Sequence, residues 1–196
     1  MKKGLLITIL VLVAIGGLVL WCMGAYNGMV TAEEQVDAQW SNVENQYQRR
    51  ADLIPNLVNT VKGYASHEST TLENVIAARA RATSTTINVN DLDEATLRKY
   101  QAAQGELSQA LGRLLAVTES YPDLKANQNF LELQAQLEGT ENRITVARDR
   151  YNDIARQFNV TIRRFPAVLM AGIAGFDKKP YFQAEAGASS APKVEF

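Results

Sequence analysis

The chain has 196 residues, 46% of them hydrophobic, and a net charge of −1. This length suits one domain plus an anchor, not two separate cores. The near-neutral charge excludes the basic surface that nucleic-acid binding requires. The single cysteine, Cys22, excludes a disulfide within the chain and gives no information about the redox compartment.

The first element is an uncharged apolar stretch over residues 4–24. As a helix it would span about 31 Å at ~1.5 Å per residue, which matches the hydrocarbon core of a bilayer. A cleaved signal peptide is the rival interpretation, but its apolar region is shorter and its cleavage site needs small residues. Trp21 occupies the position before Cys22 that lipoprotein signals fill with a small residue. We therefore expect an uncleaved transmembrane anchor over residues 1–25, with Trp21 and Tyr26 in the interfacial aromatic belt.

The charges that flank this stretch predict its orientation. Lys2 and Lys3 precede it, whereas the next basic residue is Arg49, and acidic residues, among them Glu33, Glu34 and Asp37, lie between. Because basic residues are enriched on the cytoplasmic side, we expect the N-terminus in the cytoplasm and the rest of the chain outside.

The next helix either begins within residues 25–29 or continues the membrane helix without a break. Its apolar side chains recur in steps of three and four and their sums, which predicts one buried face. They are Met29, Val36, Trp40, Val43, Tyr47, Ile54, Leu57 and Val61. Pro55 lacks an amide donor and clashes with the carbonyl of Ala51, so we expect a kink or break at residues 53–55.

Polar residues surround this proline and form the first candidate site. A kink exposes carbonyl groups, to which Arg49, Arg50 and Asn56 would donate, and Asp52 would pair with either arginine. We interpret these residues, with Pro55, as a network that fixes the geometry of a bent helix. A ligand site is the alternative.

Two helices and two connections follow. A helix is predicted over residues 62–82, with Tyr64, Leu72, Val75 and Ile76 as its apolar residues and Arg79 and Arg81 outward. Residues 83–90 form a loop. A further helix starts at Asp91, with Glu94 at capping-box spacing, and runs to Thr118. Residues 120–123 form a turn.

The last long helix, over residues 129–165, has the most regular pattern. Its side chains alternate in steps of three and four: Phe130, Leu133, Leu137, Thr140, Ile144, Ala147, Tyr151, Ile154, Phe158, Thr161 and Phe165. This 3.5-residue period is typical of the seam of a left-handed bundle or coiled coil. The fold class is therefore all-α, with a membrane helix followed by an elongated helical bundle over residues 26–165.

The chain then becomes apolar over residues 166–182 and small and polar over 183–196, which we expect to be disordered. The apolar segment either folds back as a lid or forms an exposed interface. Its candidate contact residues are Phe165, Leu169, Phe176, Lys178, Lys179, Tyr181 and Phe182, with the lysines facing anionic lipid or an acidic partner. Phe196 ends an apolar-x-apolar sequence of the kind that strand-addition domains capture.

Groups suited to catalysis are sparse. His67 is the one histidine, and a zinc site needs three or four ligands. We therefore read His67, beside Glu68, as a surface or capping residue. The sequence predicts no metal, no cofactor and no small-molecule substrate.

Several stretches of the sequence are distinctive. They are Arg49-Arg50-Ala51-Asp52-Leu53-Ile54-Pro55-Asn56, Ala38-Gln39-Trp40-Ser41-Asn42-Val43, Val61-Lys62-Gly63-Tyr64-Ala65-Ser66-His67-Glu68, Gly175-Phe176 and Ala191-Pro192-Lys193-Val194-Glu195-Phe196. These stretches resemble the LemA family of bacterial membrane proteins, and the first of them is the most specific. The resemblance implies a single-span protein of the bacterial inner membrane with an antiparallel helical bundle and no established enzymatic activity. Some relatives carry a lipoprotein-like cysteine, which leaves lipidation of Cys22 open.

From the anchor, the apolar seam and the lack of catalytic groups we predict a non-enzymatic scaffold or adaptor. Its expected partners are the lipid bilayer and further copies of itself, with a membrane protein as a further candidate. The alternative is an accessory subunit of a membrane protease or an envelope stress-response system, which the resemblance suggests.

Overall fold

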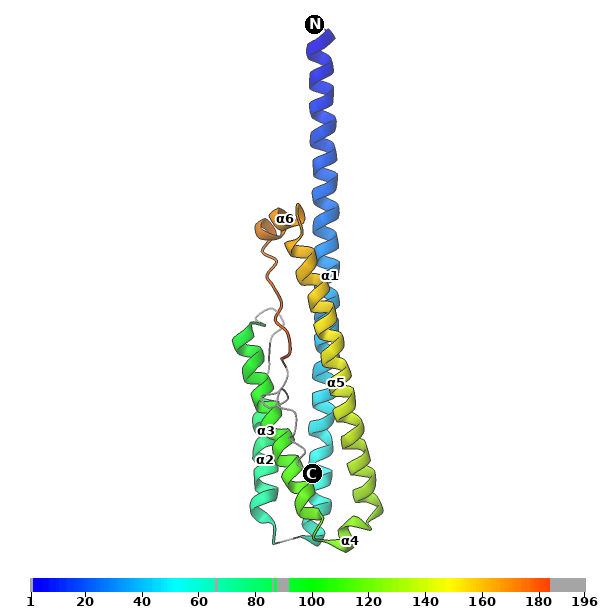
Figure 1. Ribbon diagram of the computed structural model, residues 1–196, viewed down its shortest axis with the longest axis vertical. Coiled ribbons are helices and arrows are strands. Elements are labelled where there is room, and N and C mark those ends of the chain that lie inside the picture. The colour runs from blue at the N-terminus through cyan, green and yellow to red at the C-terminus, as the bar shows by residue number, and fades with distance from the viewer. Residues whose placement is uncertain (1, 66, 86, 88–91, 184–196) are drawn as a thin grey trace, which may run out of the picture. The chain divides into compact units, whose positions relative to one another are not determined.

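The computed structural model describes residues 2–65, 67–85, 87 and 92–183, and the regular structure within them is entirely helical (Figure 1). The helices are α1 (Lys2–Tyr64), α2 (Ser69–Ser84), α3 (Glu94–Thr118), α4 (Pro122–Lys125), α5 (Gln128–Arg163) and α6 (Ala167–Ala174). The predicted all-α helical-bundle class is confirmed. The chain divides into two compact units: unit 1 is residues 1–39 with 153–179, and unit 2 is residues 40–152 with 180–196.

Helix α1 continues the apolar stretch into the bundle without a break. Between Leu5 and Leu20 its large apolar side chains are 50–72% exposed. Burying one such side chain contributes ~1.5–3 kcal/mol, so a row of them left exposed needs an apolar surrounding. By length and composition, α1 is the one helix in the described part of the chain that could cross a membrane.

Pro55 lies inside α1, so the helix does not break at residues 53–55. A proline cannot donate to the carbonyl four residues before it, which here is that of Ala51. Arg79 on α2 takes over this role, because its Nε donates to the Ala51 carbonyl oxygen over 2.8 Å. A neighbouring helix thus supplies the hydrogen bond that the proline removes.

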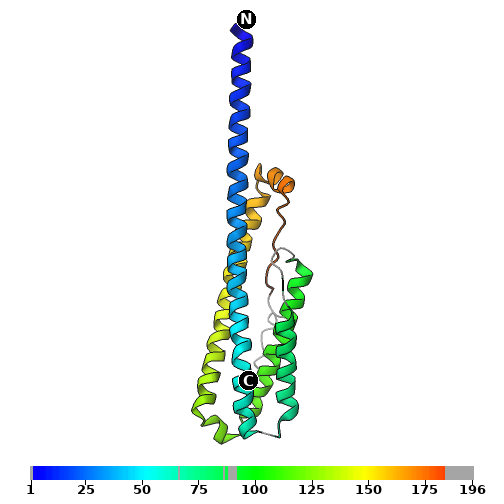
Figure 2. The same cartoon turned by 180° about the vertical axis from the view of Figure 1, so that it is seen from behind.

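In unit 2, α1 and α5 run antiparallel. Asn127, which precedes α5, donates to the Tyr64 hydroxyl over 2.8 Å, and Arg50 pairs with Glu141 at 2.8 Å. From the first contact to the second, the residue number falls along α1 by as much as it rises along α5, as antiparallel packing requires. Figures 1 and 2 both show α2 and α3 side by side in this unit.

The predicted inward face of α1 is confirmed: all eight of its side chains are at most 5% exposed. In unit 2 this face packs in an apolar core with residues of α2, α3, α4 and α5. The core includes Ile54, Leu57, Val61, Leu72, Val75, Leu107, Leu111, Leu114, Leu124, Phe130 and Leu137.

The second and third helices begin later than predicted. α1 keeps its last turn through Tyr64, with a bond from the Ala65 amide to the Val61 carbonyl, and α2 begins only at Ser69. Of the apolar residues named for this helix, Leu72 and Val75 are buried, whereas Tyr64 and Ile76 are 45% and 52% exposed.

The start of α3 also differs from the prediction. α3 begins at Glu94, because the Asp93 carboxylate caps it by accepting from the Thr96 amide over 2.6 Å. The predicted start, Asp91, lies outside the described residues. The predicted turn at 120–123 leads into the short helix α4, which has Pro122 in its first turn, a position that tolerates proline.

The regular seam predicted for α5 holds only over its first part. Phe130, Leu137, Thr140, Ile144, Ala147, Tyr151 and Phe158 are buried, but after Tyr151 burial also includes Ala155, Asn159 and Ile162, which lie outside the predicted seam. Thr161 and Phe165 are exposed instead, the latter by 81%. A straight α-helix has 3.6 residues per turn and drifts about 20° per heptad from a 3.5 repeat, which accounts for this shift.

Candidate interaction sites

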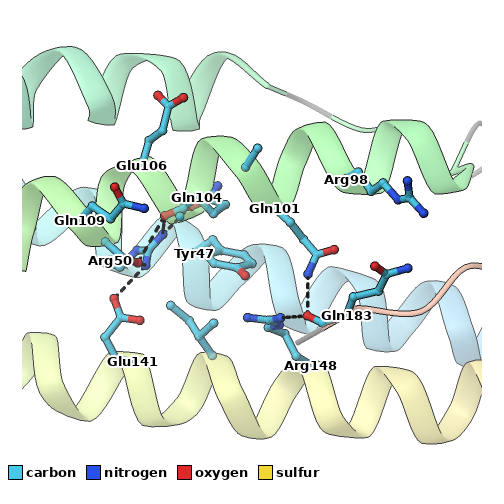
Figure 3. A pocket seen from close by; sticks show the side chains of 14 residues that line it. Tyr47, Arg50, Arg98, Gln101, Gln104, Glu106, Gln109, Glu141, Arg148 and Gln183 are labelled. Carbon is cyan, nitrogen blue, oxygen red and sulfur yellow. Dashed lines mark hydrogen bonds and ion pairs between the residues drawn. The ribbon is translucent and has the colours of Figure 1, made fainter. Parts of the chain in front are cut away.

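Arg50 lies at the centre of the polar contacts in unit 2, with only 1% of its surface exposed. One terminal nitrogen donates to Ser108 Oγ and Glu141 Oε1, both at 2.8 Å. The other donates to the side-chain and main-chain oxygens of Gln104, at 2.6 and 3.2 Å. The Tyr47 ring covers its guanidinium at 5.2 Å. One side chain on α1 therefore connects α1, α3 and α5, as Figure 3 shows.

The burial of Arg50 could have been predicted from its position in the sequence. Arg50 falls in the apolar stripe of α1, between Tyr47 and Ile54, at steps of three and four. Gln104 stands in the same way between Tyr100 and Leu107 of α3. Two polar residues in facing apolar stripes indicate a buried hydrogen-bonded pair, because an unpaired buried polar group is costly.

The extended segment after α6 adds a second polar cluster. The Gln183 carbonyl accepts from Gln101 on α3 at 3.1 Å and from Arg148 on α5 at 2.9 Å (Figure 3). Asn152 bonds both backbone groups of Phe182, accepting from its amide at 2.8 Å and donating to its carbonyl at 3.0 Å. Side chains of α3 and α5 thus hold a strand-like stretch of backbone.

The Phe182 ring completes an aromatic cluster in unit 2. It stacks on Trp40 with centroids 5.8 Å apart and meets Tyr151 edge-on at 5.3 Å. Trp40 also contacts Tyr100 at 5.6 Å. Such ring pairs add to the burial of apolar surface, so they fix this end of the segment against the helices.

A cavity of about 490 Å³ opens between these two polar clusters. Its described lining is Tyr47, Arg50, Arg98, Gln101, Ala102, Gln104, Gly105, Glu106, Ser108, Gln109, Glu141, Ile144, Arg148 and Gln183. Charged groups at its rim already pair: Arg98 with Glu94 at 2.5 Å, and Glu106 with Arg81 at 2.9 Å. The lining contains no histidine or cysteine, so its chemistry suits the binding of polar groups by arginine and amide donors.

Burial shifts two titratable groups in a neighbouring pocket, which shares Tyr47 and Gln104 with this cavity. It raises the pKa of the Tyr100 phenol, with smaller contributions from neighbouring groups. It also raises the pKa of the Glu44 carboxyl. Both shifts follow from desolvation of the charged form, which structural side chains also experience. No group of three or more His, Cys, Asp or Glu side chains in the described residues is placed to hold a metal ion.

The residues predicted around Pro55 separate in the structure. Arg50 points inward, whereas Arg49, Asp52 and Asn56 lie at the exposed surface. Asp52 accepts from Gln48 on its own helix at 2.7 Å. The donor to the Ala51 carbonyl, which the proline leaves without its helical partner, is Arg79, which had been predicted to point outward. The role of the cluster in fixing the bundle remains a prediction.

His67 is exposed between α1 and α2. The adjacent Glu68 accepts from the Tyr121 hydroxyl over 3.0 Å and precedes α2 without a side-chain capping bond.

The C-terminal apolar segment is exposed at some of its predicted contact residues and buried at others. Phe165 and Leu169 are 81% and 60% exposed, as an interface would require. Lys179 and Phe182, at 8% and 6%, are buried and do not belong to an exposed surface. The Lys179 ammonium pairs with Glu33 at 2.7 Å, and Asn159 bonds both of its backbone groups.

The remaining members of the predicted surface are intermediate or undescribed. Phe176 and Tyr181 are half-buried, and Lys178 is exposed. The polar tail after Gln183, with Phe196, lies outside the described residues.

Together these features define a class: all-helical chains with an apolar N-terminal helix that continues into a bundle closed by buried polar contacts. The LemA family model matches residues 39–196, and the chain belongs to the LemA family.

Curated relatives agree with this assignment. The chain is 30% identical over 175 residues to magnetosome protein MamQ 2 of Paramagnetospirillum magneticum, covering 81% of this chain and 64% of the relative. It is 30% identical over 174 residues to magnetosome protein MamQ of Magnetospirillum gryphiswaldense, covering 80% and 64%. It is 24% identical over 143 residues to protein LemA of Metamycoplasma hominis, covering 73% and 62%. The chain thus spans less than two thirds of the length of these relatives. None of their names denotes an enzyme activity.

Proposed function

We propose that this protein is a non-enzymatic, membrane-anchored scaffold that associates with further copies of itself through its helical bundle. The N-terminal half of α1 holds it in the bacterial inner membrane, with the bundle on the extracytoplasmic side. The exposed apolar side chains of α1 support the anchor. The cavity chemistry and the names of the family and its relatives support a role without catalysis.

The proposal of self-association rests on exposed apolar residues on the outward face of α5. Leu131 and Val146 are 45% and 49% exposed, and Ala135 is exposed between them. With 3.6 residues per turn, the three side chains fall within about 60° of one another around the helix. A face of this kind, with apolar groups set among polar ones, is typical of non-obligate interfaces.

Site-specific photo-crosslinking in native membranes tests this proposal. A photoreactive residue replaces Val146 in the full chain, and crosslinked products are identified by mass spectrometry. We expect crosslinks that join two copies of the chain. Ile76 on α2 is the matched control, since it is equally exposed and β-branched. Only monomer at position 146, with no crosslinked partner, would contradict the scaffold.

The alternative is an accessory subunit of a membrane protease or an envelope stress-response system. The polar cavity favours it in one respect, because arginine and amide donors there suit a peptide partner. The same experiment separates the two proposals: crosslinks from position 146 to a different membrane protein, without self-contacts, would support the accessory subunit.

A further inference from the structure

Most of the large apolar side chains of helix α6 are exposed. Ala171 is buried, but Val168, Leu169 and Ile173 are 40%, 60% and 82% exposed, and Phe165 just before the helix is 81% exposed. The helix contains no charged or hydrogen-bonding side chain. An apolar patch this concentrated at one end of a chain marks a contact surface.

Contacts within unit 1 place α6 at the end of the apolar stretch of α1. The ring of Phe176, just after α6, lies 5.8 Å from that of Tyr26. Tyr26 is two residues beyond Gly24, or about 3 Å further along the helix axis. It therefore lies at the depth where a bilayer's hydrocarbon core meets its headgroups.

The chain then runs away from the apolar stretch. Lys179 pairs with Glu33 of α1 at 2.7 Å. Glu33 lies ~10 Å further along α1 than Tyr26, and three extended residues, from Phe176 to Lys179, also cover ~10 Å. The segment after Phe176 therefore runs along α1 away from the apolar residues 4–24. Helix α6, which precedes Phe176, stays close to the end of those residues.

Charges flank α6 on both sides. Arg163 and Arg164 precede it and Lys178 follows it, all exposed, against a single acidic residue, Asp177. Basic side chains next to an apolar segment suit the headgroup region of a membrane that contains anionic lipid. Eight helical residues are too few to cross a bilayer, so the helix would lie in its surface.

We propose that α6 is a second membrane contact, an interfacial helix that inserts Phe165, Leu169 and Ile173 into the lipid beside the transmembrane part of α1. The continuity of this surface with the exposed apolar face of α1 favours lipid as the occupant over a second protein chain. The proposal rests on the membrane anchor of the proposed function, but not on self-association. The bilayer would then hold the chain at two points.

Spin labelling of the full chain in nanodiscs of phosphatidylcholine and phosphatidylglycerol tests this contact. Single cysteines replace Ile173 or Leu169 in a Cys22→Ala background. Two positions on α1 serve as references: Val13, in the apolar stretch, and Gln35, exposed and about 16 Å beyond Gly24. Collisions with oxygen, which concentrates in lipid, and with a water-soluble nickel chelate report the surroundings of each label.

We expect labels at Ile173 and Leu169 to match Val13, with several-fold fewer nickel collisions than at Gln35. Labels that match Gln35 while Val13 stays protected would overturn the proposal and leave the anchor intact. A water-like result at Val13 as well would overturn both. Spin–spin broadening at Ile173 that disappears on dilution with unlabelled chain, together with few oxygen collisions, would assign α6 to a second copy instead.

Discussion

Individual polar side chains hold this bundle at places where the backbone or the apolar pattern is interrupted. Pro55 removes one hydrogen bond from α1, and Arg79 restores it at the Ala51 carbonyl. Arg50 takes a place in an apolar stripe and bonds to α3 and α5. The most specific part of the family resemblance, residues 49–56, thus includes both the proline and the buried arginine. Both residues lie at contacts that join α1 to other helices.

The link between Pro55 and Arg79 predicts a coupling that a double-mutant cycle measures. Arg79→Ala leaves a buried carbonyl without a donor, which should lower the free energy of unfolding by ~1–3 kcal/mol. In a Pro55→Ala background the amide of residue 55 can donate to Ala51, so the same change should cost less than half as much. Urea unfolding of the full chain in detergent, followed by circular dichroism, gives all four values.

Arg81→Ala is the matched control for this cycle. Arg81 lies on the same helix and pairs with Glu106, but both side chains are more than half exposed. Its loss should change stability by no more than ~0.5 kcal/mol in either background. Equal costs of Arg79→Ala with and without Pro55 would show that Arg79 acts independently of the proline.

At the scale of the helices, capping decides where α3 begins. Asp93 accepts from Thr96, and these hydrogen bonds lower the pKa of its carboxyl. A carboxyl whose pKa is lower in the folded than in the unfolded chain stabilises the fold above its unfolded pKa of about 3.9. This contribution is lost as the pH falls through the lower, folded pKa.

Replacing Asp93 separates its charge from its role as a cap. Asp93→Asn keeps the capping oxygen, so its thermal midpoint should follow that of the parent chain above about pH 5 and fall less below pH 4. Asp93→Ala should be less stable than both at neutral pH. Midpoints measured by circular dichroism from pH 3 to pH 7 check this, and parallel curves for Asp93→Asn and the parent chain would contradict it.

The sequence predicted helices and their buried faces well where the apolar pattern repeats over many residues, as in α1 and the first part of α5. It failed where a non-local partner decided the outcome. Next to Pro55, Arg79 of another helix donates to the Ala51 carbonyl, and the buried Lys179 contacts Glu33 and Asn159. The burial of Phe182 likewise requires Trp40, Tyr151 and Asn152, which are distant in sequence.

The candidate sites show the same division. Arg50 and Gln104 could have been assigned from their places in apolar stripes, because period alone puts them inside. Arg148 and Gln183 could not, since their contact depends on how the segment after α6 folds back within unit 2. In the later part of α5, Phe158 is buried as predicted but Thr161 is not, because a strict 3.5 repeat does not follow a straight helix.

For the whole molecule, the central claim is that α1 serves both as membrane anchor and as a helix of the bundle. The helix is continuous from Lys2 to Tyr64, with exposed apolar side chains before Trp21 and buried ones from Met29 onward. This change from outward to buried apolar groups within one helix is what a bilayer followed by a protein core would require.

The intact mass of the protein, taken from washed membranes of the cells that produce it, tests this claim most directly. Alkaline carbonate washing removes peripheral proteins first, and mass spectrometry then gives the N-terminus of what remains. We predict a membrane-bound chain that retains residues 4–24. A chain found in the soluble fraction that begins after Ala25 would contradict the account.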